Sequence, residues 1–230
     1  SNNGSYCIVP YVRGPLRNRN YKDILKELNL AIDRGITRFT LLGQNVNAYE
    51  YDGVNFIGLL KLIDSIKDVE EFSFITSHPK DTTPELVKLM QDSRKLKKYL
   101  HLPVQSGSNR ILELMNRNYT KEFYLELVDN YRRIVREGIL TTDIIVGFPT
   151  ETEDDFLQTM KLIEQVRFNS AYIFKYSPRP YTKAENLPDD VKKEEKEKRH
   201  FLLLELQKKI SLEYQKYNFY NEASCPISFP

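Results

Sequence analysis

Strand-like and helix-like segments alternate along most of this 230-residue chain, which predicts an α/β fold built on a parallel sheet. The strand-like segments are short and apolar, and each is followed by a segment with apolar residues at helical spacing. The sequence shows no β-hairpin signal between these units, so helical crossovers are expected to join the strands. Two architectures satisfy this pattern: a doubly wound sheet, or a partial (β/α)6 barrel that stays open.

The composition fits a single large domain inside a reducing compartment. Hydrophobic residues make up 40% of the chain, enough for a sizeable core, and no apolar run approaches the ~20 residues of a membrane span. The polar start lacks a signal-peptide pattern, and two cysteines do not make a disulfide framework. We therefore expect a cytoplasmic protein, a monomer with no membrane contact. The net charge of +2 neither requires nor excludes a nucleic-acid partner.

The expected strands are recognised by runs of β-branched, aromatic and aliphatic residues. They cover residues 5–12, 36–42, 71–76, 98–104, 140–146 and 171–176. Residues 49–55 are expected to form a polar loop. The first helix, over residues 20–34, is expected to end at Gly35 as its C-cap glycine.

Capping residues mark the starts of the later helices. A capping box is predicted from Thr82 to Glu85, and Thr120 and Thr152 are predicted to cap two further helices. The remaining helices are expected over residues 56–66, 109–115 and 188–217. Within the last helix, the mixed-charge run 192–199 is expected to be a solvated face. A core domain over residues 1–220 and an irregular tail over residues 221–230 complete the predicted organisation.

Chemistry in either architecture belongs at the carboxyl ends of the strands. Three amides follow the second strand within four residues, and neutral amides suit the edge of a base or nucleoside. Asp143 lies in an apolar strand, where a carboxylate needs a partner or a function. Gly147 follows it and would allow a flat ligand to approach the backbone closely. His78 precedes a proline, and His101, like His78, has no paired zinc spacing.

The usual short signatures of other enzyme classes do not occur. The sequence contains no G-x-G-x-x-G, Walker A, H-E-x-x-H or G-x-S-x-G pattern. Cys7, at the start of the first expected strand, is one of two cysteines, and the other is Cys225. A lone cysteine of this kind is either an inert buried thiol or a metal ligand whose partners must be found.

Six segments together resemble the radical SAM methylthiotransferases, over nearly the whole chain from residue 5 to about residue 217. They are SYCIVPYVRG (5–14), LLGQNVNAY (41–49), TSHP (76–79), HLPVQSGS (101–108), IIVGFPTETEDDF (144–156) and YSPRP (176–180). LLGQNVNAY and TSHP resemble the branch that adds methylthio to N6-isopentenyladenosine beside the tRNA anticodon. The resemblance implies a partial (β/α)6 barrel of the radical SAM type, with S-adenosylmethionine and a [4Fe-4S] cluster as cofactors and tRNA as partner.

The resemblance also implies roles for particular residues. Cys7 matches the third cysteine of a C-x-x-x-C-x-x-C cluster loop. The expected cofactor-binding residues are Gln44, Asn45, Gln105, Ser106, Gly147, Phe148 and Pro149. The expected substrate and RNA contacts are Arg13, Arg17, Arg19 and Asn47, with aromatic help from Tyr11 and Tyr49. The family also has an N-terminal domain and a C-terminal TRAM domain, which do not occur within these 230 residues. The electron donor and the sulfur source are not identified by the sequence.

The chain departs from the family pattern at the cluster loop. Counting back from Cys7, the second cysteine position holds Gly4, and the first falls before Ser1. One thiolate is not expected to hold a [4Fe-4S] cluster. Three interpretations therefore stay open: the core of a radical SAM tRNA methylthiotransferase, a cluster-less RNA- or SAM-binding relative, and a plain SAM- or nucleotide-binding α/β domain.

Overall fold

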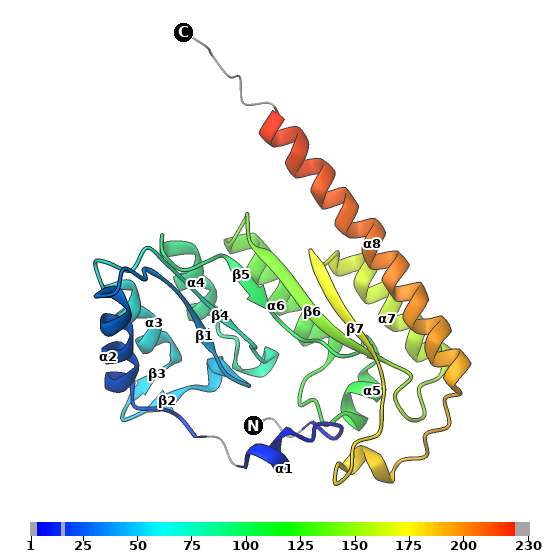
Figure 1. Cartoon of the computed structure of the whole chain (residues 1–230). Helices are drawn as coiled ribbons and strands as arrows, with labels where there is room; N and C mark the ends of the chain where they lie inside the picture. The colour runs from blue at the N-terminus through cyan, green and yellow to red at the C-terminus, as the bar shows by residue number, and fades with distance from the viewer. Residues whose placement is uncertain (1–3, 15–16, 224–230) are drawn as a thin grey trace.

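Five parallel strands form a curved, open sheet that the main helices cover on its convex side (Figure 1). The computed structural model describes residues 4–14 and 17–223, with side chains as far as residue 214. The strands are β1 (Arg38–Leu42), β4 (Glu71–Ile75), β5 (Tyr99–His101), β6 (Ile139–Val146) and β7 (Ser170–Lys175). This architecture confirms the expected partial barrel.

The sheet consists of two parallel groups of strands joined by a narrow seam. β1 pairs with β4, and β5, β6 and β7 pair in that order. Between the groups, Phe72 of β4 makes two backbone hydrogen bonds, both at 2.9 Å. Its N–H donates to the Lys95 carbonyl, and its carbonyl accepts the Lys97 N–H. The order is therefore β1-β4-β5-β6-β7, as crossover helices between parallel strands require.

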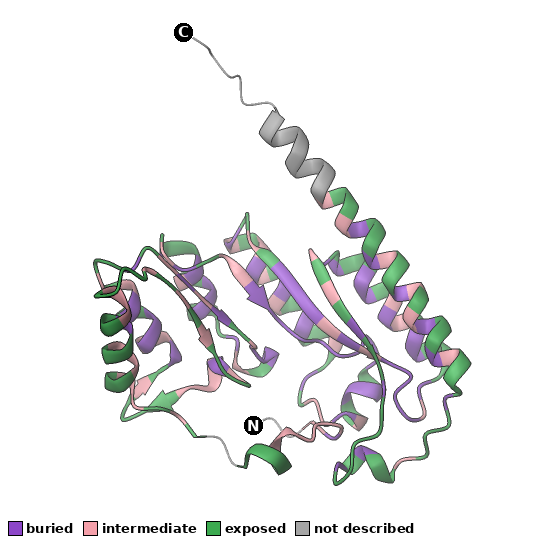
Figure 2. Ribbon diagram, viewed as in Figure 1, coloured by how far each residue is buried: buried purple, intermediate pink, exposed green. Residues whose placement is uncertain are grey.

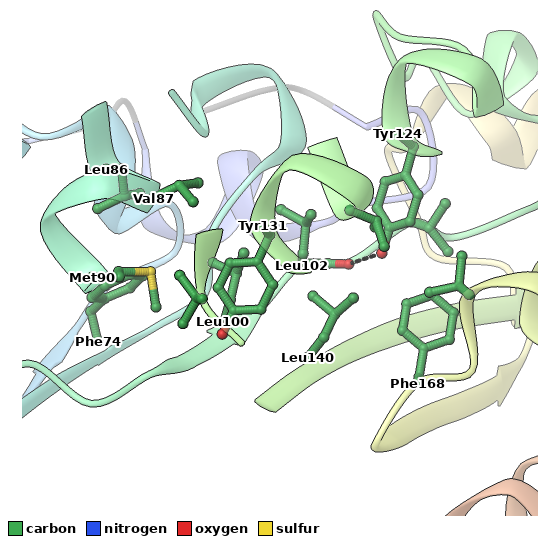
Figure 3. Packing of buried hydrophobic residues seen from close by; sticks show 14 of the residues in the cluster. Phe74, Leu86, Val87, Met90, Leu100, Leu102, Tyr124, Tyr131, Leu140 and Phe168 are labelled. Atoms are coloured by element: carbon green, nitrogen blue, oxygen red, sulfur yellow. Dashed lines mark hydrogen bonds between the residues drawn. The ribbon is translucent and has the colours of Figure 1, made fainter. Parts of the chain in front are cut away.

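The helices bury their apolar faces against the strands. They are α2 (Tyr21–Ile32), α3 (Phe56–Asp64), α4 (Pro84–Asp92), α5 (Asn109–Leu114), α6 (Lys121–Ile134), α7 (Glu153–Val166) and α8 (Lys193–Ala223). Figure 3 shows Tyr124 and Tyr131 of α6 packed over Leu100 and Leu140 of the sheet. The Tyr124 hydroxyl donates to the Leu102 carbonyl at 2.8 Å, so this buried polar atom is satisfied.

Most of the predicted helix caps are present. The hydroxyls of Thr83, Thr120 and Thr152 each accept a backbone N–H from the first turn of their helices. Gly35 has φ +83°, a left-handed conformation that suits a glycine just past a helix end. The predicted capping box at Thr82 is wrong, because the helix begins one residue later with Thr83 as its cap. A capping box does form between Thr152 and Asp155.

The predicted first strand over residues 5–12 is wrong. The segment forms a turn followed by α1 (Val9–Arg13), a short helix with no buried residue. Pro10 has no N–H to give to a sheet, and its fixed φ suits the first turn of a helix. The described residues therefore contain five parallel strands rather than the six expected.

Residues 49–55 are not a simple loop. They contain a two-stranded antiparallel hairpin made by β2 (Glu50–Tyr51) and β3 (Val54–Asn55). Asp52 and Gly53, the two residues between these strands, both have positive φ, +49° and +76°. Asp-Gly with two positive φ values is the signature of a tight hairpin turn, a signal that the sequence interpretation overlooked.

α8 begins at Lys193, five residues later than expected, and its start is more deeply packed than expected. Leu203 and Ile210 lie in the core, which confirms the predicted apolar stripe, and Figure 2 shows buried and exposed residues on opposite sides of the helix. The run 192–199 is solvated only in part, because Lys196 is 8% and Arg199 5% exposed while Lys192, Lys193, Glu194, Glu197 and Lys198 are exposed. The helix ends at Ala223, three residues into the predicted tail, and residues 224–230 lie outside the described part.

We predict that Gly107→Ala destabilises the fold. A Cβ at this position would lie 2.5 Å from the carbonyl oxygen of Gln158 and 2.6 Å from the Cα of Thr159, both backbone atoms of α7. Overpacking of this kind costs about 1–3 kcal/mol. Urea denaturation at pH 7 measures the loss, with Asn29→Ala on the exposed side of α2 as the control. Equal midpoints for the two variants would contradict the close contact between this loop and α7.

Candidate functional site

The carboxyl ends of the five strands share one edge of the sheet, and the segment containing α1 lies along this edge (Figure 1). Ser5 fixes the start of that segment. Its N–H and its hydroxyl donate to the carbonyls of Met115 at 2.9 Å and Leu114 at 2.7 Å, at the end of α5. Its own carbonyl accepts the N–H of Ala184 at 2.8 Å, in the 3-10 helix η3 (Lys183–Asn186). Three separate parts of the chain therefore meet beside Cys7.

Cys7 is half-buried and belongs to a tight turn, with its N–H donating to the Gly4 carbonyl at 3.0 Å. Within residues 4–14 and 17–214, no group of three His, Cys, Asp or Glu side chains could hold a metal ion. Cys225 lies outside the described residues. Cys7 is a free thiol, and among the described residues the predicted cluster ligand set is not completed by neighbouring side chains.

The loop after β1 uses its amides mainly to hold the loop after β4. Asn47 donates to the His78 carbonyl and the Thr82 hydroxyl, both at 3.1 Å, and accepts the His78 N–H at 3.0 Å. Asn45 donates to Asp81 at 2.7 Å, but its Oδ1 is buried without a partner. Gln44 is exposed. Of the three predicted amides, Asn47 is therefore a structural clamp, and Asn45 retains an acceptor that a ligand could use.

The loop after β4 presents buried donors with no partner in the described structure. His78 Nδ1 accepts the Lys80 N–H at 3.2 Å, so the neutral imidazole carries its proton on Nε2, which is buried and unpaired. Ser77 Oγ and Arg117 Nε are also buried and unpaired. The Arg117 guanidinium lies over the rings of Tyr6 and Tyr119, at 5.9 and 6.0 Å. These atoms can bind a ligand with acceptor groups, since buried polar groups are otherwise satisfied.

Burial, with the nearby Arg117 charge, lowers the pKa of His78 from 6.5 to about 4. We predict that this residue makes the fold less stable as the pH falls. Between pH 6.5 and about 4 the unfolded chain binds a proton that the folded chain excludes, so stability decreases as pH falls through this window. Urea titrations at pH 7 and pH 4.5 should show a smaller difference for His78→Gln than for the parent chain. The same difference in both would contradict a buried neutral His78.

The loop after β5 is buried throughout and contacts α7. The Ser106 hydroxyl lies 3.3 Å from that of Thr159 and accepts the Ser108 N–H, so it is bonded to α7 and to its own loop. The Ser108 hydroxyl donates to Asp155 at 2.6 Å. Burial would raise the pKa of Asp155, but hydrogen bonds from Arg110, Ser108 and Thr152 hold it below its usual range. Ser106 is therefore placed to hold the loop rather than a cofactor.

Gln105 is the residue of this loop that stays with the sheet. It has φ +74° and bridges β6, its N–H donating to the Asp143 carbonyl and its carbonyl accepting the Ile145 N–H, both at 2.9 Å. A left-handed conformation is uncommon for a residue with a side chain, and such residues cluster at functional sites. The predicted position of Gln105 beside the strand ends agrees with this bridge.

The turn after β6 is closed over by the start of α8. Gly147 has φ +67°, and a Cβ there would overlap the Lys196 side chain, so this turn packs closely against α8. Phe148 is buried between the rings of Tyr6 and Tyr176, and Pro149 is buried beside it. The three predicted residues thus form a packed wall that reaches the N-terminal segment.

A buried ion pair behind this wall was missed from the sequence. Arg199 Nη1 donates to Glu151 Oε1 at 2.7 Å and to the Glu151 carbonyl at 2.9 Å, with the two side chains 6% and 1% exposed. The same carboxylate accepts the Gly147 N–H at 2.8 Å. Burial raises the pKa of Glu151, which the Arg199 charge and the Gly147 hydrogen bond oppose. No sequence pattern signals this pair, because its two residues lie 48 positions apart.

The three arginines predicted to contact RNA are exposed. Arg13, at the end of α1, and Arg17 are exposed. Arg19 is also exposed but pairs with Glu27 of α2 at 2.6 Å, and its carbonyl accepts the Tyr49 hydroxyl at 2.8 Å. Of the three arginines, Arg19 has a carboxylate partner, and Arg13 and Arg17 have none in the described structure.

A hollow of about 880 Å³ lies elsewhere, at the seam between β4 and β5. Ser73, Ile75, Tyr99 and Ile139 line it, together with the chain that follows α4. Most of its lining comes from the end of α4 and the chain between α4 and β5, at the end of β5 opposite to the loop that follows it, so we do not take it as the candidate site.

Comparison with known proteins agrees with this arrangement. The family model described as the Radical SAM superfamily matches residues 2–163. The chain is 50% identical over 212 residues to a tRNA-2-methylthio-N(6)-dimethylallyladenosine synthase of Thermoanaerobacter sp. (strain X514), covering 91% of this chain and 45% of that protein. It is 49% identical over 211 residues to the protein of the same name from Moorella thermoacetica, covering 90% and 48%. The chain thus spans about half the length of these relatives.

Solved structures share the fold at low sequence identity. The radical S-adenosylmethionine methyltransferase TsrM from Kitasatospora setae superposes with a TM-score of 0.66 at 15% identity, over 80% of this chain and 36% of that chain. Coproporphyrinogen III oxidase (HemN) from Escherichia coli gives 0.59 at 16% identity, over 87% and 48%. At such identities the likeness concerns the fold alone.

Proposed function

Because the chain belongs to the radical SAM superfamily, we propose that it is the core of a tRNA methylthiotransferase that modifies N6-dimethylallyladenosine beside the anticodon. One observation carries the proposal: about 50% identity over 90% of the chain to relatives that carry this name. The cofactors of the family are S-adenosylmethionine and a [4Fe-4S] cluster. Residues 1–220 form the core domain in this proposal, tRNA is its partner, and the core acts as a monomer in the cytoplasm.

In residues 4–14 and 17–223, no helix is both long enough and apolar enough to cross a bilayer. A tRNA-modifying enzyme needs access to its substrate, which a cytoplasmic location provides. The electron donor and the sulfur source have no assigned binding surface on this chain.

The residues at the strand ends fit S-adenosylmethionine. Its ammonium group needs acceptors and its carboxylate needs donors, and the unpaired buried atoms include an acceptor, Asn45 Oδ1, and two donors, His78 Nε2 and Arg117 Nε. The cationic Arg117 would favour the carboxylate. Bound there, S-adenosylmethionine would supply the group that reacts, while these residues orient it and Phe148 excludes water from the wall of the site.

The described residues do not fit a [4Fe-4S] cluster. Cys7 is one thiol, the position of the second cysteine holds Gly4, and no other side chains near Cys7 complete a ligand set among the described residues. We therefore derive no chemical step through a cluster for this chain. The alternative expected from the sequence, a cluster-less relative that binds RNA or S-adenosylmethionine, is not favoured by the relatives found.

We predict that anaerobic reconstitution with iron and sulfide gives far less than four iron atoms per chain. The reason is that one thiolate does not hold such a cluster stably. Iron and sulfide assays, with visible absorption and EPR after reduction, measure the outcome, and Cys7→Ser serves as the matched control. Four iron atoms per chain that are lost in Cys7→Ser would instead support the complete enzyme and overturn the cluster-less candidate.

Binding of an anticodon stem-loop RNA tests the proposed substrate. We expect the chain to bind the RNA with N6-dimethylallyladenosine more tightly than the unmodified RNA, measured by fluorescence anisotropy at several salt concentrations. Arg13→Glu with Arg17→Glu should weaken both complexes and reduce the salt dependence by about one unit of slope for each lost phosphate contact. Lys161→Glu, on the exposed side of α7, is the control. Equal affinity for the two RNAs would remove the support for this substrate.

A further inference from the structure

Four polar side chains form a continuous chain of hydrogen bonds on the concave face of the sheet. Alternate residues of β5 and β6, among them Leu100, Leu140 and Ile144, are buried in the core under the helices. Because successive side chains in a strand point to opposite faces, the residues between them face the concave side. We call Tyr99, Thr141, His101 and Asp143 the inner polar chain.

The contacts of the inner polar chain fix the imidazole of His101 at both nitrogens. Nδ1 lies 2.9 Å from the Thr141 hydroxyl, which is itself 3.0 Å from the Tyr99 hydroxyl. Nε2 lies 3.3 Å from Asp143 Oδ2. The Thr141 hydroxyl donates to the Tyr99 hydroxyl, so the His101 ring contacts a hydroxyl at Nδ1 and the Asp143 carboxylate at Nε2. The ring is thereby held in one orientation, and so is the carboxylate.

Asp143 keeps part of its acceptor capacity. An ionised carboxylate has four acceptor sites, and His101 is the single side chain in the described structure that lies within hydrogen-bond distance of it. The Asp143 side chain is 27% exposed, whereas that of His101 is 10% exposed. The open side of the carboxylate therefore faces the interior of the partial barrel.

The position of Asp143 places it near the candidate site. Its charge acts on the Tyr6 hydroxyl, whose pKa is raised mainly by burial, and Tyr6 is the residue before Cys7. Asp143 also lies at the same level of the sheet as Gln105, which bonds to its carbonyl. A ligand that enters from the strand ends would therefore reach the inner polar chain directly below the N-terminal segment.

Exposed aromatic rings lie next to the inner polar chain. Tyr172 of β7 is 53% exposed and meets the His101 ring edge to face at 6.0 Å, and Phe174 is 52% exposed two residues further on. Aromatic faces of this kind stack on nucleobases. A carboxylate beside them accepts an N–H of a base and repels phosphate, since both are anionic. The combination suits a nucleobase with an exocyclic N–H.

We propose that Asp143 selects the substrate base by accepting a hydrogen bond from the exocyclic N–H of an N6-substituted adenine, and that His101 is its positioning residue. The inference rests on the proposed function, which supplies the class of base. It adds a specificity-determining contact on the concave face, distinct from the strand-end atoms assigned to S-adenosylmethionine.

A thermodynamic cycle between protein and ligand variants tests this contact. Two stem-loop RNAs are compared, one with N6-dimethylallyladenosine and one with the same base methylated at N6, which removes the N–H. The parent chain should bind the first about tenfold more tightly, the size expected for a hydrogen bond to a charged group. Asp143→Ala should bind both with the same affinity, and His101→Phe should show a reduced ratio. Thr40→Val, on the part of the concave face formed by β1, should keep the parent ratio.

The ratio of affinities, rather than either affinity alone, decides the outcome, because a general structural defect weakens both complexes equally. Asp143→Asn preserves the side-chain shape and should also lower the ratio, and circular dichroism checks that each variant is folded. The same tenfold ratio in the parent, Asp143→Ala and Asp143→Asn would overturn the inference while leaving the proposed function in place. A parent chain that binds neither the modified nor the unmodified RNA at low salt would overturn both.

Discussion

The ion pair between Arg199 and Glu151 is the interaction on which the organisation of the site depends. Both side chains are almost completely buried, and the carboxylate also accepts the Gly147 N–H. Removing one partner of such a pair leaves an uncompensated charge in the interior, which costs about 3–5 kcal/mol. The pair therefore fixes the start of α8 against the turn after β6.

The position of that turn determines the position of the N-terminal segment. Phe148 follows Gly147 and packs between Tyr176 and Tyr6, and Tyr6 directly precedes Cys7. Arg199 is thus linked to Cys7 through Glu151, the turn at Gly147 and Phe148, and Tyr6. The Cys7 turn also depends on Ser5, which joins α5 to η3.

The regular part of the fold was predictable because it obeys local rules. The strands that became β1, β4, β5, β6 and β7 were found from their apolar runs, and Thr120 and Thr152 marked helix starts correctly. Residues 5–12 have the composition of a strand but form no strand, since Pro10 cannot pair and suits a helix start. Local composition does not reveal whether a strand has a neighbour. Asp52-Gly53, by contrast, is a local sequence signal of a hairpin turn.

The location of the site was predictable from the sequence, but the roles of its side chains were less so. The loops at the strand ends do come together, yet Ser106 and Asn47 use their polar atoms inside the protein. Lys196 and Arg199 are expected at the surface because a mixed-charge run on a helix is usually solvated, and the buried partner of Arg199, Glu151, lies 48 residues away in sequence. Arg117 belongs to none of the sequence motifs. Its importance comes from its unpaired Nε and the two rings beside it, which the three-dimensional arrangement reveals.

The seam between β4 and β5 has a mechanical consequence. Backbone pairing across it is confined to the two hydrogen bonds of Phe72, whereas β6 and β7 pair over six successive residues. Bending stiffness in a sheet follows the density of its cross-strand bonds, so the curvature of this sheet can change more easily at Phe72 than elsewhere. Widening at this line would move the amide loops after β1 relative to the inner polar chain on β5 and β6. The concave face therefore spans two groups of strands that share only two backbone hydrogen bonds within the described residues.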